Sequence, residues 1–289
     1  MSEASRRRVR RARAVETAAK LITGAAAFGV IATALFVVGY IVWRGIGAIS
    51  WDFLNELPTN QMTEGGIYPV IMGTVYLVLG TAAFALPIGI MAGVYLAEYA
   101  SRSRVTRAIR LAIANMAGVP SIVYGLFGFA LFVIQLGLGV SVLSGSLTLA
   151  CVTLPVVITA TEEALRQVPK DLRQASLALG ASRLRTIYKV VLPAAAPGIV
   201  TGSILGLSRA AGETAPILFT AAAFFAPLPN SPFDKVMALP YHLYIMATQA
   251  VKPAPDIVWG TALVLVGGVS IINILAAGWR TRQRRRIKW

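Results

Sequence analysis

Charged side chains are scarce in this sequence of 289 residues: they make up 13%, against 56% hydrophobic residues and a mean hydropathy of +0.70. An ordinary soluble domain carries about 25% charged residues, so lipid is the expected solvent. The single cysteine, Cys151, excludes an intrachain disulfide. The single histidine, His242, leaves little for a metal cluster, and we expect it in an outer loop as a surface or packing residue.

Acidic residues are fewer still, because 12 Asp and Glu stand against 27 Lys and Arg, which gives a formal net charge of +15. Such an excess could indicate a nucleic-acid-binding protein. The basic residues, however, lie between apolar runs rather than on a basic domain. We therefore expect no nucleic-acid partner, and we expect the Arg-rich tails, residues 6–13 and 280–288, to contact anionic membrane lipid.

Long uncharged windows dominate the rest of the chain. They are Leu21–Trp43, Gly65–Ala97, Leu111–Thr161 and Ile257–Trp279, with a fifth apolar region, Val190–Phe233, that two charges interrupt. A helix of ~20 apolar residues crosses the ~30 Å of hydrocarbon, so the third window is long enough for two spans. Its Gly- and Ser-rich middle, residues 137–146, predicts the turn between them. The sequence predicts an all-α integral membrane protein with about six transmembrane helices.

The basic residues fall on alternate segments. Seven lie in the tail up to Lys20, four between Glu98 and Arg110, six between Glu162 and Lys189, and six from Arg280 onward. Because cytoplasmic loops are rich in Lys and Arg, we place these segments and both termini on the cytoplasmic side of the membrane, which we expect to be a plasma (inner) membrane. The loops around residues 52–64 and 227–256 then face outward.

This topology divides the chain into four parts. They are a basic cytoplasmic tail (residues 1–20), a first transmembrane helix (21–43), a five-helix membrane domain (65–280) that contains a cytoplasmic loop (162–193), and a second basic tail (281–289). The first apolar run is longer than the core of a signal peptide and lacks an obvious cleavage site, so we expect it to be retained as a span.

The cytoplasmic loop at 162–193 carries helix signals rather than a linker composition. Asp171 can cap a helix after Pro169, and Gly180 is suited to end it. Leu172, Ala175, Ser176 and Leu179 recur at helical spacing and form a small, apolar stripe. Ser182 can cap a second helix. Such a helix pair can lie flat on its own bundle or fit a groove in a partner, and the pattern favours neither.

The spacing in this loop resembles a known motif. Gln174-Ala175-Ser176, three residues, Gly180, nine residues, Val190, one residue and Leu192-Pro193 are similar to the EAA loop of permeases of ATP-binding-cassette (ABC) importers, type I. Three identities differ, at Gln174, Ser176 and Val190. The resemblance implies a type I ABC importer permease bundle whose Gln174, Ala175, Ser176 and Gly180 form a coupling helix for a cytoplasmic ATPase.

The chain contains no phosphate-binding loop of the form G-x-x-x-x-G-K-[ST]. ATP and Mg²⁺ are therefore expected on a separate ATPase subunit, and we expect this chain to bind no cofactor and to be a transporter subunit rather than an enzyme.

Two charges, Arg209 and Glu213, stand one helical turn apart in the fifth apolar region, and we expect both deep within a span. Charges there cost roughly 3 kcal/mol each on insertion scales, so they usually face a bundle interior or a water-filled path. One reading is a mutual salt bridge that fixes helix packing. The other is an anion site, because guanidinium presents a planar fork of donors that suits oxyanions such as phosphate.

The segments RAAGETAP (Arg209–Pro216) and NMAGVPSIVYGLFG (Asn115–Gly128) resemble those of phosphate-importer permeases. The similarity runs from about Gly65 to Arg280. It implies a complex with a paralogous permease, two copies of a cytoplasmic ATPase and an extracytoplasmic phosphate-binding protein. It also implies that Arg209 and Glu213 take part in phosphate passage. Within the second segment we expect a role in helix packing rather than in ligand binding for Asn115, Pro120, Ser121 and Tyr124.

Three alternatives remain open. A permease for another oxyanion, such as sulfate, molybdate or tungstate, would share most of these features. An intramembrane enzyme would need a nucleophile with its base or a set of metal ligands, and no H-E-x-x-H or G-x-S-x-G motif occurs. A membrane scaffold would explain Arg209 and Glu213 only as a bridge between helices.

Overall fold

The computed structural model describes residues 3–62, 64–101, 103–249 and 254–286. Its long helices are α1 (Glu3–Gly45), α3 (Tyr68–Val94), α6 (Val142–Gln167), α9 (Leu192–Gly212) and α12 (Pro255–Arg286). Its shorter helices are α2 (Trp51–Asn55), α4 (Arg104–Met116), α5 (Ser121–Gly128), α7 (Lys170–Ala178), α8 (Arg183–Thr186), α10 (Ala215–Thr220) and α11 (Leu239–Thr248). Strands β1 (Pro58–Thr59) and β2 (Glu64–Gly65) form a small antiparallel hairpin in which Pro58 pairs with Gly65.

Within these described ranges, five helices are long and apolar enough to cross a membrane. They are Val15–Ala48, Tyr68–Tyr99, Val142–Gln167, Arg183–Gly212 and Pro255–Arg282. A bent pair, Arg104–Met116 with Ser121–Gln135, raises the number to six if it is counted as one span. The all-α membrane fold predicted from the sequence is confirmed.

Helices α3, α6 and α9 pack against one another, α12 lies along α9, and α1 contacts α12. Small residues bring α3 close to α6: a Cβ added at Gly89 would lie 2.7 Å from Val157 Cγ1, and one added at Gly93 would lie 2.6 Å from Thr161 Cβ. Close backbone approach is how helices associate in lipid, where no hydrophobic effect drives them together. The α3–α6 contact therefore depends on these glycines.

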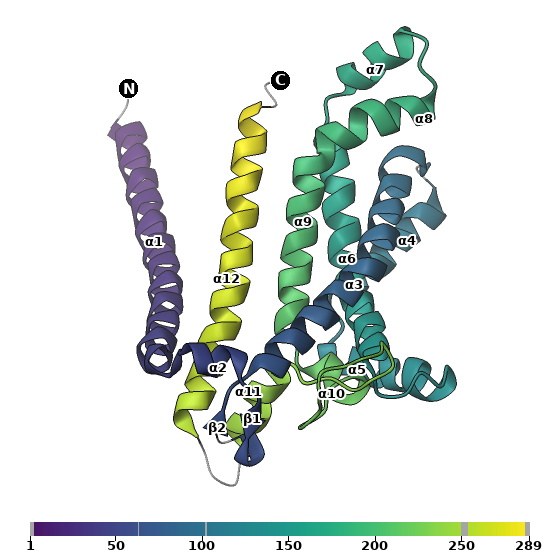
Figure 1. Cartoon of the computed structure of the whole chain (residues 1–289). Helices are drawn as coiled ribbons and strands as arrows, with labels where there is room; N and C mark the ends of the chain where they lie inside the picture. Colours follow the sequence, from purple (N-terminus) through teal and green to yellow (C-terminus); the bar gives the residue numbers. More distant parts are fainter. Residues whose placement is uncertain (1–2, 63, 102, 250–253, 287–289) are drawn as a thin grey trace.

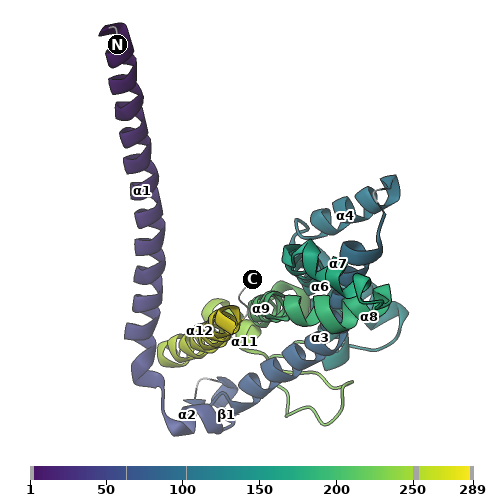
Figure 2. The same cartoon turned by 90° about the horizontal axis from the view of Figure 1, so that it is seen from above.

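Most of helix α1 stands apart from the rest of the bundle, as Figure 2 shows from above, and only its last turns contact α12. None of its most apolar 18-residue window is buried by the rest of this chain, whereas half of the corresponding window of α6 is buried. The tail at residues 1–20 does not form a separate segment, because α1 begins at Glu3 and runs without a break into the first span.

The first half of the long window Leu111–Thr161, where we expected one span, contains a sharp bend. Helix α4 ends at Met116, and the pair bends by 101° before α5 begins at Ser121. Pro120 precedes the second helix, and the Tyr124 hydroxyl donates to the Met116 carbonyl oxygen at 2.8 Å across the break. The following turn falls in the first half of the predicted range 137–146, with positive φ at Gly137 and Gly139, but α6 already starts at Val142.

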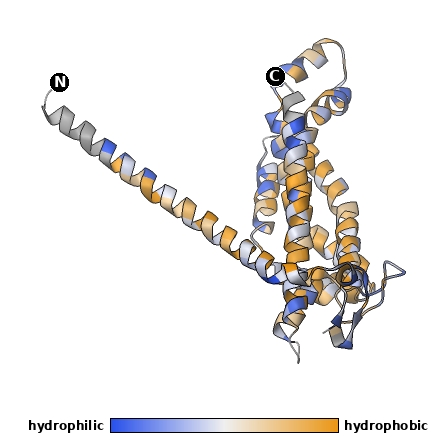
Figure 3. Cartoon of the chain, turned by 60° about the vertical axis from the view of Figure 1, so that its left-hand side comes forward, coloured by the Kyte–Doolittle hydropathy of each residue, from blue (hydrophilic) through white to orange (hydrophobic). Residues whose placement is uncertain are grey.

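The bundle has two distinct ends (Figure 1). We call the end with α7 and α8 the α7 end; the start of α1 and the end of α12 lie there too. We call the opposite end, with α2, the β hairpin and α11, the α11 end. The basic segments at the two tails and in the loop at 162–193 thus share one end, as the charge pattern predicted. Figure 3 shows hydrophobic residues along the long helices between these ends and hydrophilic residues near the α7 end.

His242 lies in α11 and is buried, with 3% of its surface exposed. Its Nδ1 lies 3.4 Å from the Thr261 hydroxyl of α12. This is the packing role that the sequence favoured, although the residue sits in a short helix and not in an irregular loop. Burial lowers the pKa of His242 from 6.5 to about 4, because a charged imidazole loses its hydration there.

Candidate functional site

Arg209 and Glu213 lie together where α9 ends, towards the α11 end. The Arg209 Nε donates to Glu213 Oε1 at 3.2 Å. Arg209 is in the last turn of α9, but Glu213 caps the helix in an extended conformation, and α10 begins at Ala215. The two charges therefore lie at the end of α9 and not inside one continuous helix. Gly212 and Pro216 break the helix, and the pair sits at the break.

The two partners differ greatly in exposure: 60% of the Arg209 side chain is accessible, against 16% of the Glu213 side chain. Glu213 thus forms a half-buried support, and the guanidinium points away from the chain's own packing. Among the described residues Glu213 is the hydrogen-bonding partner of Arg209, which leaves further N–H groups of the fork for a ligand. An arginine on an apolar span costs several kcal/mol if it faces lipid. An exposed arginine here would be accommodated by a water-filled path or by a contact with another subunit.

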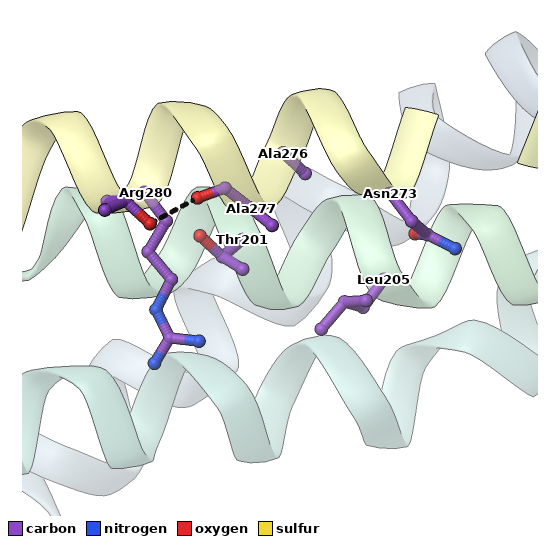
Figure 4. Close-up of a pocket in the computed structure, with 7 residues that line it drawn as sticks. Thr201, Leu205, Asn273, Ala276, Ala277 and Arg280 are labelled. Atoms are coloured by element: carbon purple, nitrogen blue, oxygen red, sulfur yellow. Dashed lines mark hydrogen bonds between the residues drawn. The ribbon is translucent and has the colours of Figure 1, made fainter. Parts of the chain in front are cut away.

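The face of α9 that bears Arg209 continues towards the α7 end. Thr201 and Leu205 precede Arg209 by eight and four residues, so the three lie on one side of the helix. Thr201 and Leu205 line a cavity of about 590 Å³ between α9 and α12. Figure 4 shows their side chains with Asn273 and Arg280 of α12, and Arg280 lies at the opposite end of this cavity from Leu205. Asn273 Oδ1 is buried without a hydrogen-bond partner among the described residues.

The loop at 162–193 forms the predicted pair of helices, α7 and α8, and the second is continuous with the next span. Pro169 occupies the N-cap position and Asp171 lies in the first turn, so the predicted cap was two residues late. Gly180 ends the helix with φ +80°. Ser182 does cap α8, but α8 continues through a π-helical turn into α9, so the second helix is the start of the next span.

The predicted stripe on α7 divides between two faces. Leu172 and Ser176 are half-buried against the bundle, and Ser176 Oγ lies 2.9 Å from the Thr186 hydroxyl. Gln174 and Ala175 are exposed, together with Leu177, Ala178 and Leu179, of which Leu179 is 89% exposed. The outer face of α7 thus carries an apolar patch beside Gln174 that this chain leaves uncovered, while the inner face fixes the helix. Ser176, a departure from the EAA motif, belongs to the inner face.

Arg173 anchors α7 to the rest of the bundle. Its guanidinium donates to Glu98 Oε1 at 2.7 Å and to the Leu165 and Val168 carbonyl oxygens at 2.7 and 2.6 Å. Glu98 ends the span that contains α3 and is only 10% exposed. The sequence analysis missed this anchor, because Glu98 and Arg173 are 75 residues apart. The available signal was a lone carboxylate at the end of an apolar window, opposite a basic loop.

A second network ties α4 to α6. Glu162 Oε1 accepts from Arg110 Nε at 2.9 Å and from Arg166 at 2.7 Å. Arg110 also donates to the Leu96 carbonyl oxygen at 2.8 Å. The Glu162–Arg166 pair could have been predicted from its spacing of four residues, whereas the contact with Arg110 needed the fold.

No group of three His, Cys, Asp or Glu side chains lies close enough to hold a metal ion in the parts of the chain that the structure describes.

A family model, "Binding-protein-dependent transport system inner membrane component", matches residues 85–289. The chain is 37% identical over 278 residues to the probable ABC transporter permease protein YqgI of Bacillus subtilis, covering 90% of this chain and 94% of that one. It is 37% identical over 249 residues to the phosphate transport system permease protein PstA 1 of Mycobacterium tuberculosis, covering 84% and 80%. It is 32% identical to the protein PstA of Xylella fastidiosa, covering 98% of this chain and 99% of that one.

Solved structures share the fold at low sequence identity. A chain of the methionine ABC transporter MetNI in an inward-facing conformation matches with a TM-score of 0.58 and 17% identity, covering 75% of this chain and 96% of that chain. A chain of a bacterial ABC transporter involved in the import of the acidic polysaccharide alginate matches with a TM-score of 0.61 and 13% identity, covering 92% and 97%.

Proposed function

Since this chain belongs to the inner membrane components of binding-protein-dependent transport systems and shares the fold of ABC importer permeases, we propose that it carries inorganic phosphate across the plasma membrane. Relatives named as phosphate transport permeases match it over most of both lengths and support this substrate. The chain is a permease subunit, and ATP is hydrolysed by a separate partner. The observation that carries the proposal is the exposed guanidinium of Arg209, which Glu213 supports at a break in an apolar span.

In this mechanism Arg209 provides a temporary site for the anion. A phosphate that enters from the α11 end replaces water at the free N–H groups of the guanidinium. These groups donate to two oxygen atoms of the phosphate at once. Glu213 keeps the Arg209 side chain oriented and lowers the net charge of the site. The anion is therefore bound weakly enough to leave. The helix break between Gly212 and Ala215 exposes backbone polar groups, as transport sites in discontinuous helices do.

The cavity between α9 and α12 supplies a continuation of this path. Thr201 and Asn273 provide polar atoms along it, and Arg280 provides a second positive charge towards the α7 end. The arrangement suits an anion that moves from Arg209 towards Arg280 when α9 and α12 separate. The wall that the chain leaves open beside Arg209 is assigned to a paralogous permease subunit in a heterodimer.

The apolar outer face of α7 is the proposed contact with the ATPase. Gln174 and Ala175 lie on that face, Ser176 fastens it to α8, and Gly180 ends it. Because Arg173 ties α7 to the end of α3, a displacement of α7 reaches a transmembrane helix directly. Two ATPase copies, one for each permease of the pair, and an extracytoplasmic phosphate-binding protein complete the proposed complex.

The proposed orientation places the α7 end in the cytoplasm. The basic residues of three segments at that end support it under the positive-inside rule. The α11 end, with the break at Glu213, then faces the binding protein.

Uptake of radiolabelled phosphate by vesicles that contain the assembled complex tests the substrate. Excess unlabelled phosphate is expected to abolish the signal, whereas sulfate, molybdate and tungstate are expected to leave it intact. Strong competition by one of these oxyanions would assign the permease to that anion instead.

A further inference from the structure

A polar cavity of about 800 Å³ lies at the α7 end, away from Arg209 and from the α9–α12 groove. The end of the α3 span, the start of α4, the end of α6 and the helices α7 and α8 form its walls. Its lining residues are Leu96, Ala97, Glu98, Ala100, Ser103, Arg107, Arg110, Arg166, Lys170, Arg173, Gln174 and Arg183.

Positive charge dominates this cavity, because six of its lining residues are basic and one, Glu98, is acidic. The carboxylates nearby are already engaged: Glu98 binds Arg173, and Glu162 binds Arg110 and Arg166. Arg183 donates to the Glu98 carbonyl oxygen and stacks on the Tyr99 ring. Like charges gathered in one concave site repel each other and attract an anion strongly.

Two of the six cations remain available. Arg107 on α4 and Lys170 on α7 are exposed and have no hydrogen-bonding or ionic partner within the described residues. Both stand near helix starts, since Ser103 caps α4 and Lys170 is the first residue of α7. The amino ends of helices carry partial positive charge and attract anions, so they reinforce the side chains.

We propose that this cavity binds a phosphoryl anion, held by Arg107 from α4 and by Lys170 from α7. The ligand is either free phosphate or the headgroup of an anionic phospholipid. Arginine and lysine are the residues that bind phosphoryl oxygens, and basic pockets between transmembrane helices at the cytoplasmic side take anionic lipid headgroups. This site does not depend on the transport path at Arg209.

Occupation of the cavity links two separate helices. Arg107 belongs to the broken span α4–α5, whereas Lys170 belongs to α7, whose outer face is uncovered. A phosphoryl group between them adds to the Glu98–Arg173 anchor and stiffens the attachment of α7 to the bundle. The anion thereby tunes how far α7 moves without moving the bundle.

The test compares three forms of the assembled complex: the unchanged protein, the double variant Arg107→Gln/Lys170→Gln, and the matched control Arg104→Gln. Arg104 is exposed on the same helix as Arg107 but does not line the cavity. In one arm, native mass spectrometry measures phosphatidylglycerol retained from mixed micelles with phosphatidylcholine. In the other arm, equilibrium dialysis measures bound radiolabelled inorganic phosphate in the absence of the binding protein.

The double variant is expected to bind at least about tenfold more weakly, since a hydrogen bond to a charged group contributes about 1.5 to 3 kcal/mol. The control is expected to bind as the unchanged complex does.

A loss of binding in the phosphatidylglycerol arm identifies a lipid headgroup, and a loss of binding in the phosphate arm identifies free phosphate. Either result supports the site. Unchanged binding in both arms overturns it. Unchanged binding with loss of the ATPase on purification also overturns it, because the cations then serve a protein contact.

Discussion

The guanidinium of Arg173 binds the carboxylate of Glu98 at 2.7 Å, so helix α7 is fastened to the end of the candidate span Tyr68–Tyr99. Arg173 is 22% exposed and Glu98 10%, which makes this a largely enclosed ion pair. Two further hydrogen bonds from Arg173 to backbone carbonyl oxygens hold α7 against the end of α6. Through these contacts a force on α7 reaches both α3 and α6.

Arg173→Gln is expected to weaken coupling more than assembly. It leaves the carboxylate of Glu98 without its partner, and breaking a buried pair costs about 3 kcal/mol at the low end of the known range. Phosphate transported per ATP hydrolysed by the complex is the measurement. The double change Glu98→Gln/Arg173→Gln should recover part of the loss, because neither charge is then left alone. Equal coupling in the single variant and the unchanged complex would contradict the anchor.

Ala175→Glu is expected to release the ATPase. Ala175 lies on the exposed outer face of α7, where a carboxylate would need to be buried on docking. Co-purification of the ATPase with the tagged permease measures the effect. Gln167→Glu is the matched control, because Gln167 is exposed at the end of α6 and lies outside α7. Retention of the ATPase at unchanged levels by Ala175→Glu would remove the docking role.

Arg209→Gln is expected to abolish phosphate uptake while the complex still assembles. The change removes the positive charge at the helix break but keeps a polar, shorter side chain. Arg209→Lys is expected to be intermediate, since lysine retains the charge and loses the planar fork. Uptake of radiolabelled phosphate, with assembly checked by co-purification, is the readout. Normal uptake by Arg209→Gln would remove the anion-site proposal.

Gly93→Val is expected to destabilise the bundle. The new side chain would start 2.6 Å from Thr161 Cβ and 2.9 Å from the Ile158 carbonyl oxygen, so α3 and α6 must separate. Overpacking typically costs about 1 to 3 kcal/mol. The apparent melting temperature of the complex in detergent measures the loss. Gly24→Val is the control, because a Cβ at Gly24 meets nothing within 4 Å. Equal melting temperatures for the two variants would argue against the close α3–α6 contact.

The stability of the chain is expected to fall as the pH drops below 6.5 because of His242. Its pKa is about 4 in the folded chain, and its ordinary value is 6.5, so the unfolded chain binds the proton first. The stabilisation from the neutral imidazole is fully present above pH 6.5 and is lost progressively towards pH 4. At pH 5 about 2 kcal/mol of it is lost. Apparent melting temperatures between pH 7.5 and 5 measure it. His242→Gln should flatten this dependence, and an unchanged slope would show that another group titrates.

Local hydropathy and charge sufficed to predict much of this protein. The apolar windows predicted the long helices. In lipid a helix is the stable form of such a run, because it pairs its own backbone N–H and C=O groups by hydrogen bonds. Ser182 and Gly180 marked their predicted boundaries through a side-chain cap and a positive φ. The predicted Asp171 cap was wrong, because Pro169 occupies the N-cap position of α7, and the span after Leu111 is bent where Pro120 precedes α5.

The sequence by itself thus determined the membrane class, the gathering of basic segments at one end, and the residues Arg209 and Glu213 as a pair, because each depends on composition or on a spacing of four residues. Only the tertiary structure decided that the pair sits at a helix break with its arginine exposed. Only the structure paired Glu98 with Arg173 and gathered six cations around one cavity. These contacts join residues far apart in the chain, and the packing of α3, α4, α6 and α7, not any local pattern, brings them within reach.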